Sequence, residues 1–232
     1  HRDLHSFPTR RSSDLITDPE SGDITLSASS SEIGILNEFC RENPEFSYDG
    51  AKATLALTGY RGLFGHVYSQ AALNVCNEER QMLGLTPLTL SAEQIEENRV
   101  KIGEIADLLR EQGYTLASFT WEGINIVNSG LNTIERDLRY WQEDVEPLVG
   151  EVRILHYPDG DHAQSDRAKL KLLTEAGFQI LSGYGDRIYM LGGNGYVHTD
   201  KVYIGGDTLR KPERQNLDRF FDASRVISPS RP

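Results

Sequence analysis

The sequence has only two cysteines in 232 residues, Cys40 and Cys76, which excludes a disulfide scaffold and a zinc site built from cysteines. We expect both as buried free thiols, with one disulfide in an oxidising compartment as the alternative. Long apolar runs are also absent, since the longest, such as Leu55–Leu57, are far too short to cross a bilayer. Clusters of Lys and Arg, which attract nucleic acid and anionic membranes, are missing too. We therefore expect no nucleic-acid partner and no membrane insertion.

The first fifteen residues, HRDLHSFPTRRSSDL, have no periodicity, no turn residues and no apolar core of a targeting peptide. Their reverse translation in one frame gives a widely used short-read sequencing adapter. We interpret residues 1–15 as translated adapter and residues 16–232 as an incomplete natural domain, whose preceding sequence was lost. Without three of the 24 basic and two of the 35 acidic residues, the natural part carries a net charge of −12.

Apolar spacing and turn residues predict helices that alternate with short strands. Helices are expected at 32–42, 91–112, 131–149, 167–176 and 216–221, and strands at 52–58, 114–120, 151–157 and 178–182. The helix at 91–112 opens with the capping sequence SAEQ, and its apolar stripe consists of Ile102, Ile105, Ala106 and Leu109. The apolar stripe of the helix at 131–149 consists of Ile134, Leu138, Trp141, Val145 and Leu148. We expect hairpins at 189–204 and, as a hairpin or loop, at 16–31, a long loop with at most one helical turn at 61–91, and an extended tail at 226–232. This order predicts parallel strands with crossover helices, in an α/β barrel or an open α/β sheet.

Three segments occur in the same order as three motifs of a known enzyme family: GAKATLALTG (50–59), GYTLASFTWEG (113–123) and HYPDG (156–160). They resemble the KATFF strand, the GHEIASHTWSH segment and the Pro-Tyr-Gly turn of the polysaccharide deacetylases, the NodB-homology carbohydrate esterases. The resemblance covers about residues 33–182. Within that family, the sequence resembles a divergent bacterial branch most. It implies an α/β fold, a deformed (β/α) barrel of the polysaccharide-deacetylase type that is truncated at its N-terminus.

The same resemblance implies hydrolysis of N-acetyl groups on glycans. In the family, two histidines and an aspartate hold a metal, and a neighbouring aspartate acts as base. We expect the Asp-Asp pair before Ile16, so the catalytic residues are unknown. The two histidine positions are Phe119 and Gly123 here, and neither side chain can ligate zinc. No cofactor is therefore assigned, although zinc is the expected metal if the chain is active.

Polar residues near the predicted strand ends are candidates for other roles. Glu122, His156, Asp161 and His162 are candidate ligands of a substitute metal site, with a polar loop as the alternative. The candidate substrate-binding residues are Trp121, Tyr157, Asp159 and His198. Trp121 can stack on a sugar ring or belong to the core. His198, with Asp200, can reach the same rim or form the polar side of the hairpin.

These features predict an exported bacterial domain, extracellular or in the cell envelope, that binds glycan with the usual metal chemistry lost. The expected partner is peptidoglycan or another cell-wall polysaccharide. The alternative is an active metal-dependent polysaccharide deacetylase with rebuilt ligands and an Asp-Asp pair upstream. A third possibility is that another N-terminal domain carries the function and this part supports it.

Overall fold

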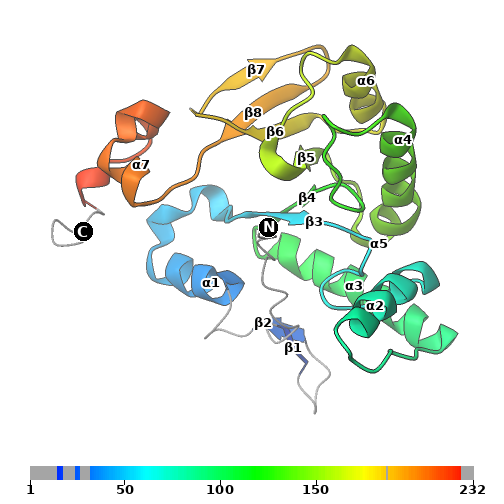
Figure 1. The fold of residues 1–232 in the computed structure, drawn as a ribbon. Helices are drawn as coiled ribbons and strands as arrows, with labels where there is room; N and C mark the ends of the chain where they lie inside the picture. Colours follow the sequence, from blue (N-terminus) through cyan, green and yellow to red (C-terminus); the bar gives the residue numbers. More distant parts are fainter. Residues whose placement is uncertain (1–14, 18–23, 27–31, 187, 226–232) are drawn as a thin grey trace. The chain divides into compact units, whose positions relative to one another are not determined.

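The computed structural model describes residues 15–17, 24–26, 32–186 and 188–225 (Figure 1). The chain divides into two compact units, residues 1–55 with 61–115 and residues 56–60 with 116–232. The expected tail at 226–232 and residues 1–14 of the interpreted adapter lie outside the described residues. No helix of the described part is both long and apolar enough to cross a membrane.

The first unit is mainly helical and begins with a short antiparallel pair. Strands β1 (Leu15–Thr17) and β2 (Ile24–Leu26) pair, which agrees with the hairpin or loop expected at 16–31, although residues 18–23 lie outside the described part. Helix α1 (Glu32–Glu42) ends as predicted before Pro44, which opens a separate 3₁₀ turn because its ring fixes φ and removes the N–H.

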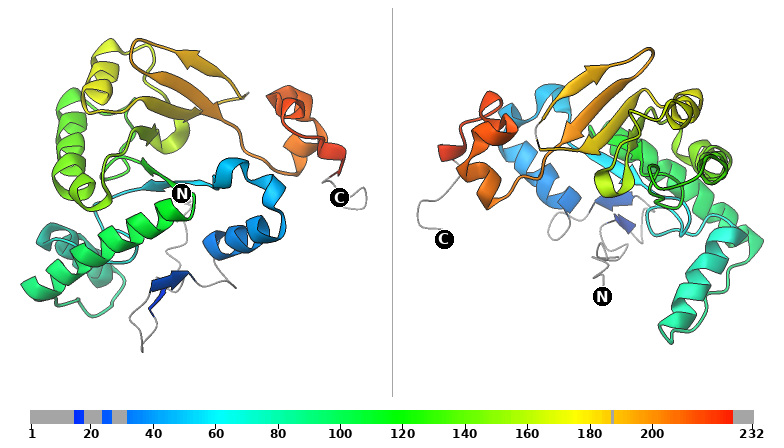
Figure 2. Two further views of the ribbon diagram at one scale, coloured as in Figure 1. Left: turned by 180° about the vertical axis from the view of Figure 1, so that it is seen from behind. Right: turned by 45° about the horizontal axis from the view of Figure 1, so that its top comes forward.

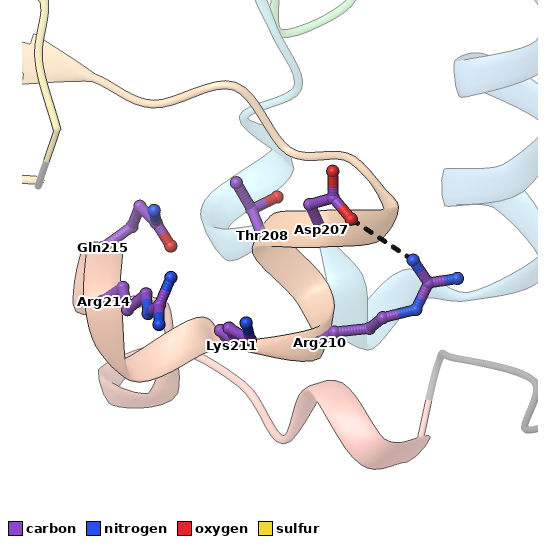
Figure 3. Close-up of a pocket in the computed structure, with 6 residues that line it drawn as sticks. All are labelled: Asp207, Thr208, Arg210, Lys211, Arg214 and Gln215. Atoms are coloured by element: carbon purple, nitrogen blue, oxygen red, sulfur yellow. Dashed lines mark hydrogen bonds and ion pairs between the residues drawn. The ribbon is translucent and has the colours of Figure 1, made fainter.

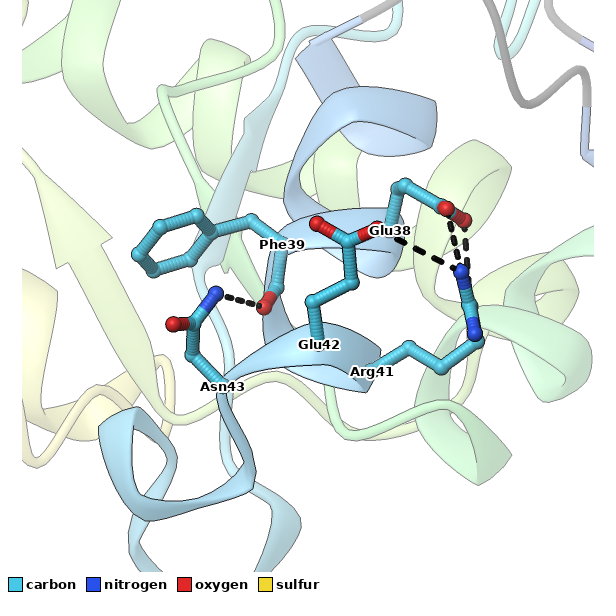
Figure 4. A network of polar contacts seen from close by, with 5 residues as sticks. All are labelled: Glu38, Phe39, Arg41, Glu42 and Asn43. Atoms are coloured by element: carbon cyan, nitrogen blue, oxygen red, sulfur yellow. Dashed lines mark hydrogen bonds and ion pairs between the residues drawn. The ribbon is translucent and has the colours of Figure 1, made fainter.

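The end of α1 carries a small polar network on the surface (Figure 4). Arg41 pairs with Glu38 and, at 3.6 Å, with Glu42, and all three side chains are largely exposed. The Asn43 side chain donates a hydrogen bond to the Phe39 carbonyl at 2.9 Å. Exposed ion pairs of this kind contribute little to stability, so the helix depends mainly on its packing.

Helix α3 (Ala92–Glu111) confirms the predicted capping sequence. The Ser91 hydroxyl accepts the Gln94 N–H at 3.2 Å, and the Gln94 side chain accepts the Ser91 N–H at 2.9 Å. The predicted apolar stripe is buried and consists of Ile102, Ile105, Ala106 and Leu109. Gly113 follows with φ of 87°, where a Cβ would lie only 2.0 Å from the Gly50 carbonyl oxygen, so glycine is required.

The prediction of a long loop at 61–91 is wrong, because helix α2 (Gln70–Met82) occupies much of this segment. Ser69 caps this helix by accepting the Ala72 N–H at 3.1 Å. Only Ala72 and Leu73 are buried along it, and this short apolar stripe gave a weak periodic signal between the flanking glycines. Both cysteines are free, with Cys40 buried and Cys76 half-buried.

The chain has an α/β fold with a mainly parallel sheet of six strands, in the order β3-β4-β5-β6-β8-β7 (Figures 1 and 2). The strands are β3 (Thr54–Leu57), β4 (Thr115–Ser118), β5 (Ile154–His156), β6 (Ile180–Tyr184), β7 (Met190–Gly192) and β8 (Val197–Lys201). Pairs β4–β5, β5–β6 and β6–β8 are parallel, whereas β7 and β8 form the predicted antiparallel hairpin. Among the described residues this sheet is linear, with β3 and β7 at its ends, and the predicted barrel closure is not seen.

The amphipathic helix predicted at 131–149 contains a π turn. It consists of α4 (Leu131–Tyr140), a π turn at Trp141–Val145, and α5 (Glu146–Val149). The extra residue of the π turn advances the register, so Val149 is buried where Leu148 was expected on the stripe. Helix α4 packs against α6 (Arg167–Glu175), beside the sheet in Figure 1.

The segment after β8 contains more helix than the sequence indicated. Helix α7 (Gly206–Arg210) and 3₁₀ turns at Pro212–Gln215, Leu217–Arg219 and Ala223–Arg225 occupy it. The terminal helix expected at 216–221 is only the 3₁₀ turn at Leu217–Arg219, because Asn216 adopts a left-handed conformation that interrupts helical hydrogen bonding.

Candidate functional site

Four parallel strands of the second unit end at one edge of the sheet. The carboxyl ends of β4, β5, β6 and β8 meet there, and ligand sites of α/β sheets typically lie outside such ends. The loops after β4 and β5 contain most of the candidate residues predicted from the sequence. The geometry of these loops therefore determines which candidates can act together.

The loop after β4 begins with a strained residue. Thr120 is buried and β-branched, yet its φ is 61°, a conformation that such residues rarely adopt. The Ser118 hydroxyl accepts the Thr120 N–H at 3.0 Å, and the Thr120 hydroxyl accepts the Ile124 N–H at 2.9 Å. These two bonds hold a tight turn over the segment that resembles the histidine motif.

Asp137 on α4 anchors the same loop. Its carboxylate accepts the N–H groups of Trp121 at 2.7 Å and of Glu122 at 2.9 Å, and only 3% of the residue is exposed. Burial raises the pKa of the Asp137 carboxyl, and the two backbone hydrogen bonds partly oppose this effect. Sequence reasoning missed this residue. Its helical spacing, three residues after Ile134 and four before Trp141, is a signal that could have found it.

The two positions that the sequence resemblance aligns with histidines, Phe119 and Gly123, offer no metal ligand. Phe119 is half-buried and donates its backbone N–H to Leu57 at 2.8 Å, and Gly123 has φ of 74°. Glu122, between them, is exposed. Among the described residues, Glu122 does not belong to a group of His, Cys, Asp or Glu side chains close enough to share a metal ion.

Trp121 lies in the core of the second unit and not at its rim. The residue is 9% exposed, and its ring centroid is 4.8 Å from that of Tyr140 and 6.2 Å from that of Tyr60. A Cβ on Gly59 would approach the indole to 2.6 Å, so this glycine makes room for the ring. This placement favours the core alternative for Trp121 over sugar stacking.

The Pro158–Gly160 turn after β5 presents two acidic side chains to solvent. Asp159 has φ of 61°, and both Asp159 and Asp161 are exposed. The Asn125 amide group lies 3.3 Å from a carboxylate oxygen of each. The loops after β4 and β5 are therefore joined by a polar cluster of one amide and two carboxylates, hereafter the Asn125 cluster, which combines Asn125, Asp159 and Asp161.

An exposed aromatic residue lies against this turn. Tyr184, at the end of β6, is 54% exposed, and a Cβ on Gly160 would approach its Cβ to 2.5 Å. Its ring also lies 5.2 Å from the ammonium group of Lys201. Tyr184 is not among the candidates from the sequence, because its exposure depends on where β6 ends.

A second polar group lies on the buried side of β8. His198 and Asp200 are 0% and 8% exposed, and their Nε2 and Oδ1 atoms are 3.1 Å apart. His162, from the loop after β5, places its ring centroid 4.6 Å from that of His198. The structure thus brings together two predicted candidates, His162 and His198, with Asp200. Burial lowers the pKa of His198, and its hydrogen bond to Asp200 opposes this shift.

Tyr157 and His156 occupy opposite sides of β5. The Tyr157 ring is 1% exposed, and its hydroxyl has no regular hydrogen-bond partner among the described residues. Burial raises the pKa of Tyr157 to about 12, partly opposed by the nearby Ala163 backbone. His156 Nδ1 lies 2.8 Å from Lys201 Nζ, and burial together with the charge of Lys201 lowers the pKa of His156 to about 4. His156 is therefore neutral near pH 7.

A separate cavity of about 400 Å³ lies in the segment after β8 (Figure 3). Its lining residues are Asp207, Thr208, Arg210, Lys211, Arg214 and Gln215. Three of these residues are cationic: Arg210, Lys211 and Arg214. Arg210 pairs with Asp207 at 3.3 Å, which neutralises one of the three charges. No candidate residue from the sequence lines this cavity.

Comparison with known proteins yields one distant structural likeness. No protein-family model and no curated protein matches the chain. A solved structure from Mycobacterium smegmatis, described as a "putative polysaccharide deacetylase", is similar with a TM-score of 0.36 and 14% identity. The similarity covers 68% of this chain and 61% of that chain, so this chain spans less than two thirds of that protein. At this TM-score the likeness is too weak to assign a function.

Proposed function

We propose that this chain is an exported glycan-recognition domain of the polysaccharide-deacetylase type, without the usual metal centre of that family. The sequence resemblance supports the type, and the replacement of both motif histidines by Phe119 and Gly123 supports the loss of that centre. The expected ligand is peptidoglycan or another N-acetylated cell-wall polysaccharide. Such a ligand requires the protein to act outside the cytoplasm.

The observation that carries the proposal is the rim formed by Tyr184 and the Asn125 cluster. An exposed aromatic ring offers a flat apolar face for a pyranose ring, and the amide and carboxylates offer acceptors and donors for its hydroxyl and acetamido groups. A rim of this kind suits a long, neutral polymer that binds across a surface. Trp121 and Tyr157, which are buried, have no direct part in this binding.

The proposal is tested by binding of the full chain to chitin oligosaccharides in calorimetry and to peptidoglycan sacculi in co-sedimentation. We expect Tyr184→Ala to lose most of the affinity, because a stacked aromatic residue supplies the main apolar contact. Tyr48→Ala is the matched control, since Tyr48 is 91% exposed in the first unit. Equal binding by both variants, or no binding by the unaltered chain, would contradict the proposal.

One observation favours a second function, the metal-dependent deacetylase with rebuilt ligands. His162, His198 and Asp200 form a compact group with the ligand types of a hydrolytic zinc site. Acetate release from acetylated chitin or xylan oligomers, measured on the full chain with zinc or cobalt, distinguishes an enzyme from a binding domain.

A further inference from the structure

We propose that His162, His198 and Asp200 bind a divalent transition-metal ion, for which zinc is the natural probe. This site differs from the histidine-motif positions Phe119 and Gly123, because it is built from the loop after β5 and from strand β8. It goes beyond glycan recognition at the exposed rim, which needs no metal.

The first support is geometric. One ligand atom from each of the three side chains lies within 4.8 Å of the other two, so one ion can contact all three after small side-chain rotations. His198 and Asp200 occupy alternate positions of β8 and therefore point to the same face of the sheet. His162 approaches that face from the loop after β5, with its ring inclined by 69° to that of His198.

The second support is a pair of unsatisfied atoms. The Nδ1 atoms of His162 and His198 are both buried, and neither has a hydrogen-bond partner among the described residues. His198 is fully buried, so an Nδ1 atom without a hydrogen bond or a metal bond is energetically costly there. No described residue engages either of these nitrogens, and a metal ion can bind at such a nitrogen.

The third support is the space that glycines leave around Asp200. A Cβ on Gly185 would lie 2.1 Å from one carboxylate oxygen of Asp200, and a Cβ on Gly183 would lie 3.2 Å from the other. The Gly183 Cβ would also approach the His162 ring to 3.3 Å. The backbone at the end of β6 thus comes close to the carboxylate only because both residues lack side chains.

The donor set selects the kind of metal. Two imidazoles and one carboxylate suit zinc and other first-row transition metals, whereas calcium and magnesium prefer oxygen ligands alone. Three protein ligands leave at least one position for water or another ligand, as in catalytic zinc sites. The site would therefore hold an ion with one exchangeable position.

The test is titration of the full chain, freed of metal by a chelator, with Zn²⁺ in calorimetry and Co²⁺ in absorption spectroscopy. We expect one equivalent of Co²⁺ to give d–d bands of four- or five-coordinate geometry. His162→Gln should weaken the binding by at least roughly 10- to 100-fold, the effect of losing even an outer-shell partner. His66→Gln is the matched control, because His66 is also half-buried but belongs to the first unit.

A second measurement needs no variant at the site. In histidine ¹H–¹⁵N spectra of the unaltered chain, Zn²⁺ should shift the ring nitrogens of His162 and His198 and leave those of His66 and His156 in place. The signals are assigned with His→Gln variants at positions 1, 5, 66 and 156, which leave those of His162 and His198. The proposal is overturned if the folded chain binds no Zn²⁺ or Co²⁺ at micromolar concentration, or if the ion shifts other histidines. Because glycan binding is measured separately, failure of one proposal leaves the other standing.

Discussion

The Asp137 carboxylate accepts the backbone N–H of Trp121 at 2.7 Å, and so ties the loop after β4 to helix α4. Its other oxygen accepts the Glu122 N–H at 2.9 Å. A single buried side chain therefore satisfies two backbone donors in the segment that resembles the histidine motif. This contact holds the loop that contains the strained Thr120 turn.

Replacement of Asp137 by asparagine, its closest isostere, should lower the stability of the folded chain. In Asp137→Asn, the amide offers one oxygen and one NH₂ group, so one of the two backbone N–H groups loses its acceptor. We expect a loss of about 1–3 kcal/mol in the free energy of unfolding, measured by urea denaturation. Glu135→Gln, at an exposed position of the same helix, should change it by less than about 0.5 kcal/mol. Equal values for both variants would contradict the anchoring role.

The same residue predicts a pH effect. Because folding raises the pKa of Asp137 above its ordinary value of 3.8, the folded state binds this proton more tightly than the unfolded state. The contribution of this group to stability is thus greatest below pH 3.8 and is lost as the pH rises through the folded pKa. Urea denaturation between pH 3 and 7 measures the free energy of unfolding of the unaltered chain and of Asp137→Asn. The advantage of the unaltered chain over the variant should decline as the pH rises. A difference that stays constant over this range would count against it.

Gly185 should not tolerate a side chain. A Cβ there would lie 2.1 Å from Asp200, which is buried and bonded to His198, so Gly185→Ala should cost about 1–3 kcal/mol by overpacking. Gly192→Ala is the control, since no atom of the described residues, apart from its chain neighbours, lies within 4 Å of a Cβ at that position. Thermal unfolding measures both. A Gly185 variant as stable as the Gly192 variant would show that Asp200 moves freely.

The Tyr157 hydroxyl should contribute nothing to stability. The hydroxyl is buried, and among the described residues it has only the nearby Ala163 backbone and no hydrogen bond of good geometry, so Tyr157→Phe removes a desolvation cost and leaves the packing of the ring intact. We expect a neutral or stabilising effect of up to about 1 kcal/mol in urea denaturation. A loss of more than about 1 kcal/mol would reveal a partner for the hydroxyl, such as an internal water.

Helix α3 provides a test of the buried stripe in the first unit. Ile105 is 1% exposed and Val100 on the same helix is 56% exposed. Ile105→Ala should lower the free energy of unfolding by about 2–5 kcal/mol, because it removes buried methyl groups and leaves a cavity. Val100→Ala should change it by less than about 0.5 kcal/mol. Similar losses from both substitutions would mean that the helix is not packed on that stripe.

The sequence by itself determined the α/β class, most strands and helices, and the stripe of α3. Local patterns suffice for these features, because the Ser91 cap, Gly113 and the apolar spacing act over a few residues. Helix α2 was missed because its buried stripe is short, and the π turn after Tyr140 because Leu148 and Val149 are both apolar and fit either register. The predicted type of domain remains a prediction.

Only the tertiary structure decided which candidates meet. Sequence distance separates His162 from His198, yet the parallel pairing of β6 with β8 and the path of the loop after β5 bring their rings to 4.6 Å. The same packing buries Trp121 and exposes Tyr184, although both are aromatic residues near strand ends. Burial and proximity depend on contacts between segments far apart in the chain, and no local pattern of residues encodes those contacts.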